Sequence, residues 1–360
     1  MSDLLRIATR KGLFVARRQR DGWRLETPPA FLGQPLSNLL RDPRDGVLYA
    51  ALNLGHFGVK LHRSEDAGVT WAELPAPAFP KTDGEHAPAV DMIWTLVPGG
   101  AEEPGVLWAG TLPGALFRSS DRGESWTLNQ ALWDQPSRAK WFGGGYDKPG
   151  IHTILLDPRD PKAMTVGISC GGVWTSADGG ESWNLGGRGL VAAYMPPELA
   201  DQPEIQDPHR LAWCALRPER LWCQHHNGMF ISDDAGKSFR SIEPPKPSAF
   251  GFAVAAHPSE PDTAWYVPAV KDECRVPVDG HFVVLRSDDG GRSFTAFDRG
   301  LPSAASYDLV YRHGLDVDES GRRLAMGSTT GNLWTSEDGG ESWTALSANL
   351  PPIAAVAFDR

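Results

Sequence analysis

Cysteine is scarce in this sequence, and the few cysteines present form no recognisable framework. The 360 residues include only Cys170, Cys214, Cys223 and Cys274, and no two of them are spaced as a CxxC pair. Two disulfides are arithmetically allowed, but a chain of this length can bury a core without them. We expect free thiols in a reducing compartment, and therefore a cytoplasmic location.

Long apolar runs and an excess of positive charge are also missing. No stretch of 18 apolar residues occurs, so no membrane-spanning helix is expected. The first residues lack a basic segment followed by an apolar one, so no secretory signal is predicted. The formal net charge of -10 argues against nucleic acid and against an anionic membrane surface as partners, because both attract a basic face.

The sequence is rich instead in turn residues and tryptophan, and it contains a repeat. Its 39 glycines, 30 prolines and 14 tryptophans are typical of an all-β protein with many short strands. Six segments share the pattern Ser-x-Asp-x-Gly-x-Ser/Thr-Trp/Phe, at residues 64–71, 119–126, 176–183, 232–239, 287–294 and 336–343. Their third-position aspartates lie 49 to 57 residues apart, which indicates one structural unit per repeat.

Each repeated segment has the residues of a tight hairpin turn. The aspartate can accept backbone N–H bonds across the turn, and the glycine can take a positive φ. The closing aromatic residue begins the next strand and can pack between sheets. Two further strands precede each turn, as at residues 151–156 and 163–168. Four antiparallel strands in about 50 residues make one blade of a β-propeller, so we interpret the repeated aspartates as structural.

Six repeated turns nevertheless predict seven blades. Residues 4–25 resemble the outer three strands of a blade, and residues 353–359 resemble an inner strand with no blade after it. The C-terminal strand should join the N-terminal blade and close the ring, which removes free sheet edges. We predict one all-β domain over residues 1–360, a seven-bladed β-propeller with blades at 4–25 plus 352–360, 36–75, 91–129, 151–186, 210–242, 251–297 and 312–347.

The turns and blades resemble the bacterial neuraminidase repeat, or Asp-box, superfamily over essentially the whole chain. The chain is most similar to its single-propeller bacterial members labelled sialidase-like or glycosyl hydrolase, whose activity the repeat does not define. Sialidases carry a Phe/Tyr-Arg-Ile-Pro motif before the first repeat. The nearest match, Leu5-Arg6-Ile7-Ala8, lacks the aromatic residue and the proline, which disfavours a true sialidase. Tandem-propeller xyloglucanases in the superfamily need a second propeller.

Long, irregular links between blades share one face of the predicted disc with the hairpins between second and third strands, and such loops commonly carry function. Five histidines fall near the channel mouth on this face, namely His152, His209, His225, His226 and His313. Converging imidazoles can bind a divalent transition metal such as Zn²⁺, which activates water or polarises a substrate oxygen. No HExxH-like spacing supports such a site, and the alternative for each histidine is a hydrogen-bonded loop residue.

A metal-free alternative uses two carboxylates as acid and base, as glycosidases do. The candidates are Asp147, Glu204 and Asp207. Substrate contact is expected from Trp141, Tyr146 and Lys148, because the aromatic faces can stack on a sugar ring and the glycines between them let the backbone approach a ligand. Arg275 is a candidate polar contact at the rim. The alternatives are an aromatic-anchored loop for the first segment and a solvated hairpin tip for Arg275.

Two functions of different classes remain. The first is an intracellular hydrolase- or lyase-like enzyme, metal-assisted or not, acting on a small or carbohydrate-like substrate at the loop-rich face. The second is a non-catalytic propeller that binds a small ligand or a protein partner through the same face. The concentration of polar and aromatic residues at one channel mouth favours the enzyme.

Overall fold

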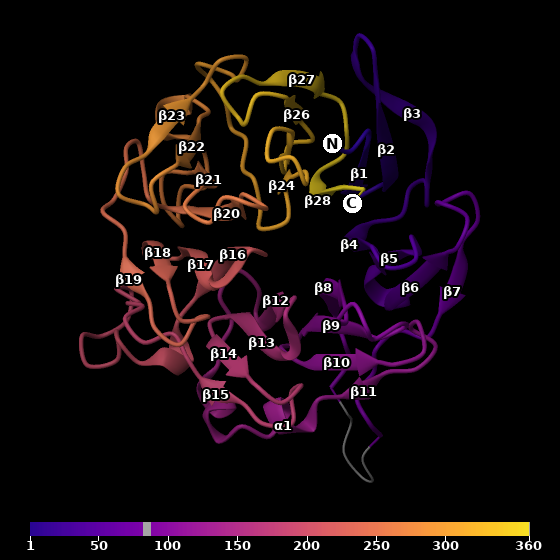
Figure 1. Ribbon diagram of the computed structural model, residues 1–360, viewed down its shortest axis with the longest axis vertical. Helices are drawn as coiled ribbons and strands as arrows, with labels where there is room; N and C mark the ends of the chain where they lie inside the picture. The colour runs from indigo at the N-terminus through magenta and orange to yellow at the C-terminus, as the bar shows by residue number, and fades with distance from the viewer. Residues whose placement is uncertain (82–87, 360) are drawn as a thin grey trace.

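Each repeat folds into one four-stranded antiparallel sheet, and the sheets form a ring (Figure 1). The computed structural model describes residues 1–81 and 88–359, and in this part of the chain seven such sheets are found. The prediction of an all-β, seven-bladed propeller is therefore confirmed. Within the described ranges no helix is long and apolar enough to cross a membrane.

The blades follow one another in chain order, with the innermost strand of each blade given first. Blades 1 to 3 consist of β28 (Ile353–Phe358), β1 (Leu4–Thr9), β2 (Gly12–Gln19) and β3 (Gly22–Ala30), then β4 (Leu36–Arg41), β5 (Leu48–Asn53), β6 (Val59–Ser64) and β7 (Ala72–Leu74), then β8 (Met92–Pro98), β9 (Leu107–Leu112), β10 (Leu116–Ser119) and β11 (Thr127–Leu128). Blade 4 consists of β12 (Gly150–Asp157), β13 (Asp160–Ser169), β14 (Gly172–Ser176) and β15 (Asn184–Leu185).

The remaining blades repeat the same order. Blades 5 to 7 consist of β16 (Pro208–Cys214), β17 (Arg217–His225), β18 (Gly228–Ser232) and β19 (Arg240–Ser241), then β20 (Gly251–Ala256), β21 (Ala264–Pro268), β22 (Val284–Ser287) and β23 (Thr295–Phe297), then β24 (Leu315–Val317), β25 (Leu324–Gly327), β26 (Leu333–Ser336) and β27 (Thr344–Ser347). The short helices lie in loops: α1 (Gln130–Trp133) and the 3-10 turns Gly55–Phe57, Pro136–Lys140, Pro203–Ile205 and Val278–Gly280.

The C-terminal strand completes the first blade, as the sequence predicts. β28 pairs antiparallel with β1, and the two ends of the chain lie side by side in Figure 1. Arg6 on β1 donates two hydrogen bonds of 2.7 and 2.9 Å to the carboxylate of Asp359. Ile353, Val356 and Phe358 are buried in the cluster that joins blade 7 to blade 1. Arg360, at the end of the predicted closing segment, lies outside the described residues.

The repeated aspartates are fully used by their own turns. In the third repeat, Asp178 accepts hydrogen bonds from the Ser176 hydroxyl at 2.8 Å and from the Ser182 backbone N–H at 2.9 Å. The Ser182 hydroxyl donates to the second carboxylate oxygen at 2.5 Å. Gly180 takes a φ of 86°, and its N–H donates to the Ser176 hydroxyl. The same bonds recur at the aspartates of the other five repeats, Asp66, Asp121, Asp234, Asp289 and Asp338.

These turns make an acid-sensitive contribution to stability. Bonds from the serine or threonine at the seventh position lower the pKa of Asp66 and Asp178 to about 2, from an ordinary value of 3.8. A carboxyl whose pKa is depressed on folding stabilises the protein above its unfolded pKa and loses that contribution as the pH falls through its folded pKa. We therefore expect the melting temperature, followed by circular dichroism, to fall steeply between pH 4 and pH 2. The melting temperature should fall less steeply with pH in the double variant Asp66→Asn/Asp178→Asn. An unchanged dependence on pH would show that these two aspartates do not cause the loss of stability in acid.

The innermost strands of blades 2 to 6 share an irregularity near the channel. In each, the register against the second strand shifts close to the strand's beginning, as in a β-bulge. The shift leaves unpaired what we call the bulge residues: Ser37, Trp94, His152, His209 and the pair Phe252 and Ala253.

Three bulge residues bond to the next blade. Ser37 Oγ donates to the carbonyl of Ile93 at 2.7 Å, and His152 Nε2 lies 2.7 Å from the carbonyl of Pro208. His209 Nδ1 lies 2.6 Å from the carbonyl of Gly251. In each case the acceptor immediately precedes the bulge residue of the following blade. The bulge therefore directs a side chain toward the inner strand of the next blade, where its hydrogen bond links the two blades.

Candidate functional site

A cavity of about 620 Å³ opens among the loops of blades 4, 5 and 6. Its walls come from the links that precede β12, β16, β20 and β24, from the β13–β14 and β17–β18 hairpins, and from the loop between β21 and β22. All are inter-blade links or hairpins between second and third strands. Phe142, Tyr194, Phe250 and Phe252 supply aromatic walls, and the remaining lining is largely polar.

Strand pairing in blade 5 brings three ligand-type side chains together at the cavity floor. Asp207 immediately precedes β16, and His209 is the bulge residue of that strand. His226 lies in the hairpin that joins β17 to β18. Pro208 pairs with His225 across the two strands, and the His226 N–H extends the ladder by donating to the Asp207 carbonyl at 3.0 Å. The three residues therefore converge because β16 and β17, which place them, are neighbouring strands.

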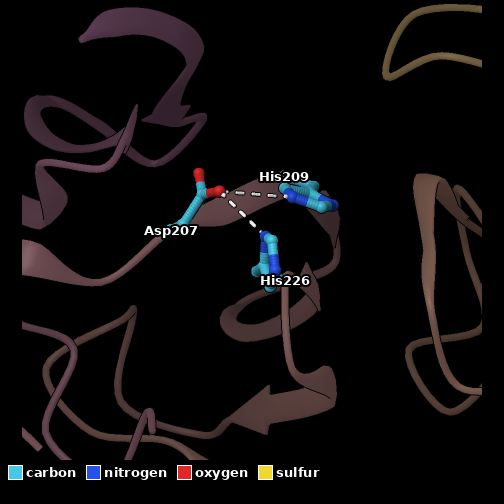
Figure 2. A group of neighbouring side chains, drawn as sticks. All are labelled: Asp207, His209 and His226. Carbon is cyan, nitrogen blue, oxygen red and sulfur yellow. Dashed lines mark ion pairs between the residues drawn. The ribbon is translucent and has the colours of Figure 1, made fainter. Parts of the chain in front are cut away.

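One carboxylate oxygen faces both imidazoles (Figure 2). Asp207 Oδ2 lies 3.3 Å from His209 Nε2 and 3.4 Å from His226 Nδ1. The three ligand atoms all lie within 4.8 Å of one another. Asp207 and His209 are only 4% and 2% exposed, whereas His226 is partly open to the cavity. We call these three residues the Asp207 triad.

Neighbouring groups fix the orientation of the triad. Asp207 Oδ1 accepts hydrogen bonds from Ser169 Oγ at 3.0 Å and from the Cys170 N–H at 3.2 Å. The imidazole of His209 stacks on Phe252 with ring centres 4.3 Å apart and an interplanar angle of 11°. Gly144 covers the carboxylate, since a Cβ there would lie 2.6 Å from Cys170 Sγ and 3.5 Å from Asp207 Oδ2. Such orienting partners are what a metal-binding histidine or carboxylate ordinarily has.

Burial and charge determine the protonation of the triad. Burial alone would raise the pKa of Asp207, but His209, His226 and Arg312 hold this pKa well below its ordinary value. Burial lowers the pKa of His209, against the opposing effect of Asp207. A carbonyl oxygen only accepts, so the proton of neutral His209 lies on Nδ1, facing Gly251. A neutral His209 presents a lone pair on Nε2 to Asp207 Oδ2, whereas a proton or a metal ion between these two atoms makes the contact favourable.

The triad has the composition of a transition-metal site. Two imidazole nitrogens and one carboxylate oxygen suit Zn²⁺ and similar ions. Three protein ligands leave at least one coordination position for water or substrate, as in catalytic sites. Among residues 1–81 and 88–359 no other group of three or more His, Cys, Asp or Glu side chains has such geometry.

The other predicted metal ligands are not part of the triad and are used in hydrogen bonds. The ring nitrogens of His152 bond to Thr153 Oγ1 at 2.9 Å and to the Pro208 carbonyl. His225 faces two backbone N–H groups, those of Asp207 and Asn227, and burial lowers its pKa to about 3. His313 Nε2 lies 3.0 Å from the His152 carbonyl. These three histidines do not belong to the set of ligand atoms that lie within 4.8 Å of one another, so the structure does not group them with the triad.

Most of the other predicted catalytic and substrate-contact residues lie outside the cavity lining. Glu204 forms an ion pair with Lys140, and Asp147 is exposed on the link before β12. Trp141 is buried against Trp174 rather than presenting a face to a ligand. Of the carboxylate candidates, only Asp207 lines the cavity. Because Asp207 lies between two histidines, it is better suited to bind a metal ion than to act as a general acid or base paired with a second carboxylate.

The remaining predicted substrate contacts divide between the cavity and its surroundings. Tyr146 packs edge-on against Trp94, and Lys148 pairs with Asp91 at 2.6 Å. Arg275 does line the cavity, where its guanidinium bonds to Asp272. Arg312 also lines the cavity and was not among the predicted residues. Its one signal in the sequence is its place beside His313 at the end of a long link.

Comparison with known proteins relates the chain to other propellers. No family model matches it. A Neosartorya fischeri protein named as a probable oligoxyloglucan-reducing end-specific xyloglucanase is 29% identical over 170 residues, 42% of this chain and 18% of that protein. The GH74 xyloglucanase from Xanthomonas campestris matches with a TM-score of 0.67 at 19% identity, over 96% of this chain and 53% of that one. YCF48 bound to D1 peptide matches with a TM-score of 0.53 at 14% identity, over 87% and 82%.

The structural likeness is one of fold. The chain spans about half the length of the Xanthomonas xyloglucanase, and the aligned part of the Neosartorya protein is a smaller share still. A β-propeller fold of the kind found in glycosyl hydrolases is therefore established.

Proposed function

We propose that the chain is a metal-assisted hydrolase- or lyase-like enzyme that acts on a small, carbohydrate-like substrate beside the Asp207 triad. One observation carries the proposal: the ligand atoms of Asp207, His209 and His226 all lie within 4.8 Å of one another. They do so in a cavity large enough for a small ligand. A divalent ion such as Zn²⁺ held there would polarise a substrate oxygen or activate water.

The carbohydrate-like substrate is supported by two further observations. A relative that is 29% identical over 170 residues is named as a probable xyloglucanase, and a structurally similar propeller is named as a xyloglucanase. Four aromatic side chains line the cavity, and aromatic faces are suited to the apolar faces of sugar rings. We further propose membership of the Asp-box superfamily, on the six repeated turns, and a cytoplasmic location, in keeping with four free cysteines.

Metal content of the purified protein tests the proposal. We expect about one divalent ion per chain by elemental analysis, and a rise in melting temperature when chelator-treated protein is reloaded, because a ligand that binds only the folded state stabilises it by about 2.7 kcal/mol at 100 times its Kd. Both effects should vanish in the double variant His209→Ala/His226→Ala. Turnover of a panel of esters, glycosides and uronides should vanish with them.

A matched control is available in blade 2. His56 lies exposed in the β5–β6 hairpin, the counterpart of the β17–β18 hairpin that carries His226. His56→Ala should therefore keep the metal and the activity. Absence of both from the unaltered protein would instead favour a non-catalytic propeller that binds a protein, a use illustrated by the peptide complex of YCF48.

A further inference from the structure

We propose that Arg312 binds the carboxylate of the substrate, so that the cavity takes a sugar acid or a similar hydroxy acid rather than a neutral sugar. This inference rests on the function proposed above and narrows its substrate class. It is carried by a buried guanidinium that lines the cavity without a carboxylate partner.

Aromatic rings hold the guanidinium of Arg312, and Asp207, the carboxylate whose pKa it helps to lower, forms no ion pair with it. The residue is 6% exposed, and its Nε is buried without a hydrogen-bond partner. The guanidinium carbon lies 4.8 Å from the ring centre of Trp94 and 5.3 Å from that of Phe252. Aromatic faces stabilise the cation but accept none of its in-plane N–H bonds. Among the residues that the structure describes, no carboxylate forms an ion pair with Arg312.

The other cations that line the cavity are already matched. Arg275 bonds to Asp272 at 2.6 Å, and Lys271 lies 3.5 Å from Glu273. Asp207 faces its two histidines, and an ion held by the Asp207 triad would occupy its charge. With the Asp207 charge taken up by that ion, Arg312 has no carboxylate partner among the residues that the structure describes, and burying such a charge is costly unless a ligand supplies the counter-ion.

The segment that carries Arg312 is firmly placed. Asp308, four residues earlier, accepts hydrogen bonds from Ser306 Oγ at 2.8 Å, Ser328 Oγ at 2.6 Å and Asn332 Nδ2 at 2.7 Å. Leu309 and Val310 are buried between this anchor and Arg312. A guanidinium held in this way needs little further ordering when it binds an anion, which favours affinity.

The position of Phe252 relates Arg312 to the triad. One ring contacts the guanidinium and also stacks on the imidazole of His209. A small molecule in the cavity can therefore present a carboxylate to Arg312 and a hydroxyl or ring oxygen to the Asp207 triad. The planar guanidinium suits a carboxylate, which it can bind through two parallel hydrogen bonds. A hexuronate combines both groups within one ring.

Calorimetric binding of D-glucuronate and D-galacturonate to the full chain tests the inference, with D-glucose and D-galactose as neutral counterparts. We expect the uronates to bind and the neutral sugars to bind much more weakly. In Arg312→Met the uronate affinity should fall by about 30-fold or more, because removing one partner of a buried charge pair costs at least about 2 kcal/mol. Lys148→Met, which removes an exposed cation that is paired with Asp91 and lies outside the cavity lining, should change the affinity by less than about threefold.

Separate readouts distinguish this inference from the function on which it rests. Arg312→Met should keep the metal content and melting temperature of the unaltered protein, since an unmatched buried cation is replaced by an apolar chain. Arg312→Lys, which keeps the charge, provides a second variant and should bind uronates with intermediate affinity. Uronate affinity unchanged in both variants, or no uronate binding by the unaltered protein, would overturn the inference even if the metal is present. Arg312-dependent binding without metal would support it while contradicting the metal-assisted mechanism.

Discussion

A chain that ends at residue 352 is expected to fail to form a stable propeller. It lacks β28, the strand that completes blade 1, so β1 becomes a free edge and the ring is no longer closed. Three large buried side chains are lost with it, Ile353, Val356 and Phe358, and each contributes about 1.5–3 kcal/mol. The sum of roughly 5–9 kcal/mol is comparable to the whole stability of a typical domain, about 5–15 kcal/mol. Near-ultraviolet circular dichroism and thermal unfolding measure the loss.

Adding the missing strand back as a peptide provides the control. A peptide of residues 352–360 should restore the melting transition in a concentration-dependent way, whereas a peptide with Val356 and Phe358 replaced by aspartate should not. Arg6→Met, which removes the ion pair with Asp359 but leaves the strand, should be milder than the truncation. A truncated chain with the melting temperature of the full chain would show that closure by β28 does not hold the ring together.

Asp207→Asn is expected to abolish stoichiometric metal binding while the protein stays folded. The side-chain oxygen of asparagine can still accept the bonds from Ser169 and Cys170, so the local structure keeps its partners. The amide nitrogen that replaces Oδ2 would donate to the histidine nitrogens now facing that oxygen, which satisfies the site without an ion. Loss of even an orienting partner of a metal ligand costs about 10–100-fold in affinity, so loss of the ligand itself should exceed about 100-fold.

Metal affinity in competition with a chromophoric chelator measures the effect of Asp207→Asn. Asp147→Asn is the matched control, since Asp147 is an exposed carboxylate that the sequence equally marked as catalytic. The control should bind metal as the unaltered chain does. Wild-type metal affinity in Asp207→Asn would exclude the triad as the ligand set, and so would a comparable loss in Asp147→Asn.

The fold was predictable because its signal is repeated. Six copies of one turn specify six hairpins, and complementary half-blades at the two ends indicate the seventh. The turn is also stabilised locally, because the serine, the aspartate and the seventh-position hydroxyl residue bond to one another within eight positions. Its formation therefore needs no contact with distant parts of the chain. A turn of this kind can therefore be recognised from the sequence alone.

The site was predictable only in part. Sequence reasoning named all three residues of the Asp207 triad, but it could not separate His209 from His152. Both are bulge residues of inner strands, and both bond to the next blade. The difference lies in which ring nitrogen makes that bond: His152 uses Nε2 and has Nδ1 beside Thr153, whereas His209 uses Nδ1 and leaves Nε2 toward Asp207. Ring orientation depends on packing against the following blade, which no single-sequence spacing reveals.

The positions of the aromatic side chains in the link before β12 also depend on folded contacts that the sequence does not reveal. Trp141 and Tyr146 lie in a glycine-rich link, where flat side chains suggest a ligand platform. Trp141 is instead buried against Trp174, and Tyr146 packs on Trp94. The glycine that matters is Gly144, because its missing side chain allows the link to approach Asp207. Composition identified the segment, but only the folded contacts show which of its residues meet the cavity.

The inner-strand bulges imply how such a propeller can acquire new chemistry. A bulge residue is outside the hydrogen-bond ladder, so changing it leaves strand register intact and alters what is presented beside the channel. Blades 2 to 5 carry serine, tryptophan and two histidines at this one position, and blade 6 carries a phenylalanine in its bulge. Mutation and selection can therefore act on each blade separately, and duplicated scaffolds can diverge in chemistry while inheriting the same architecture.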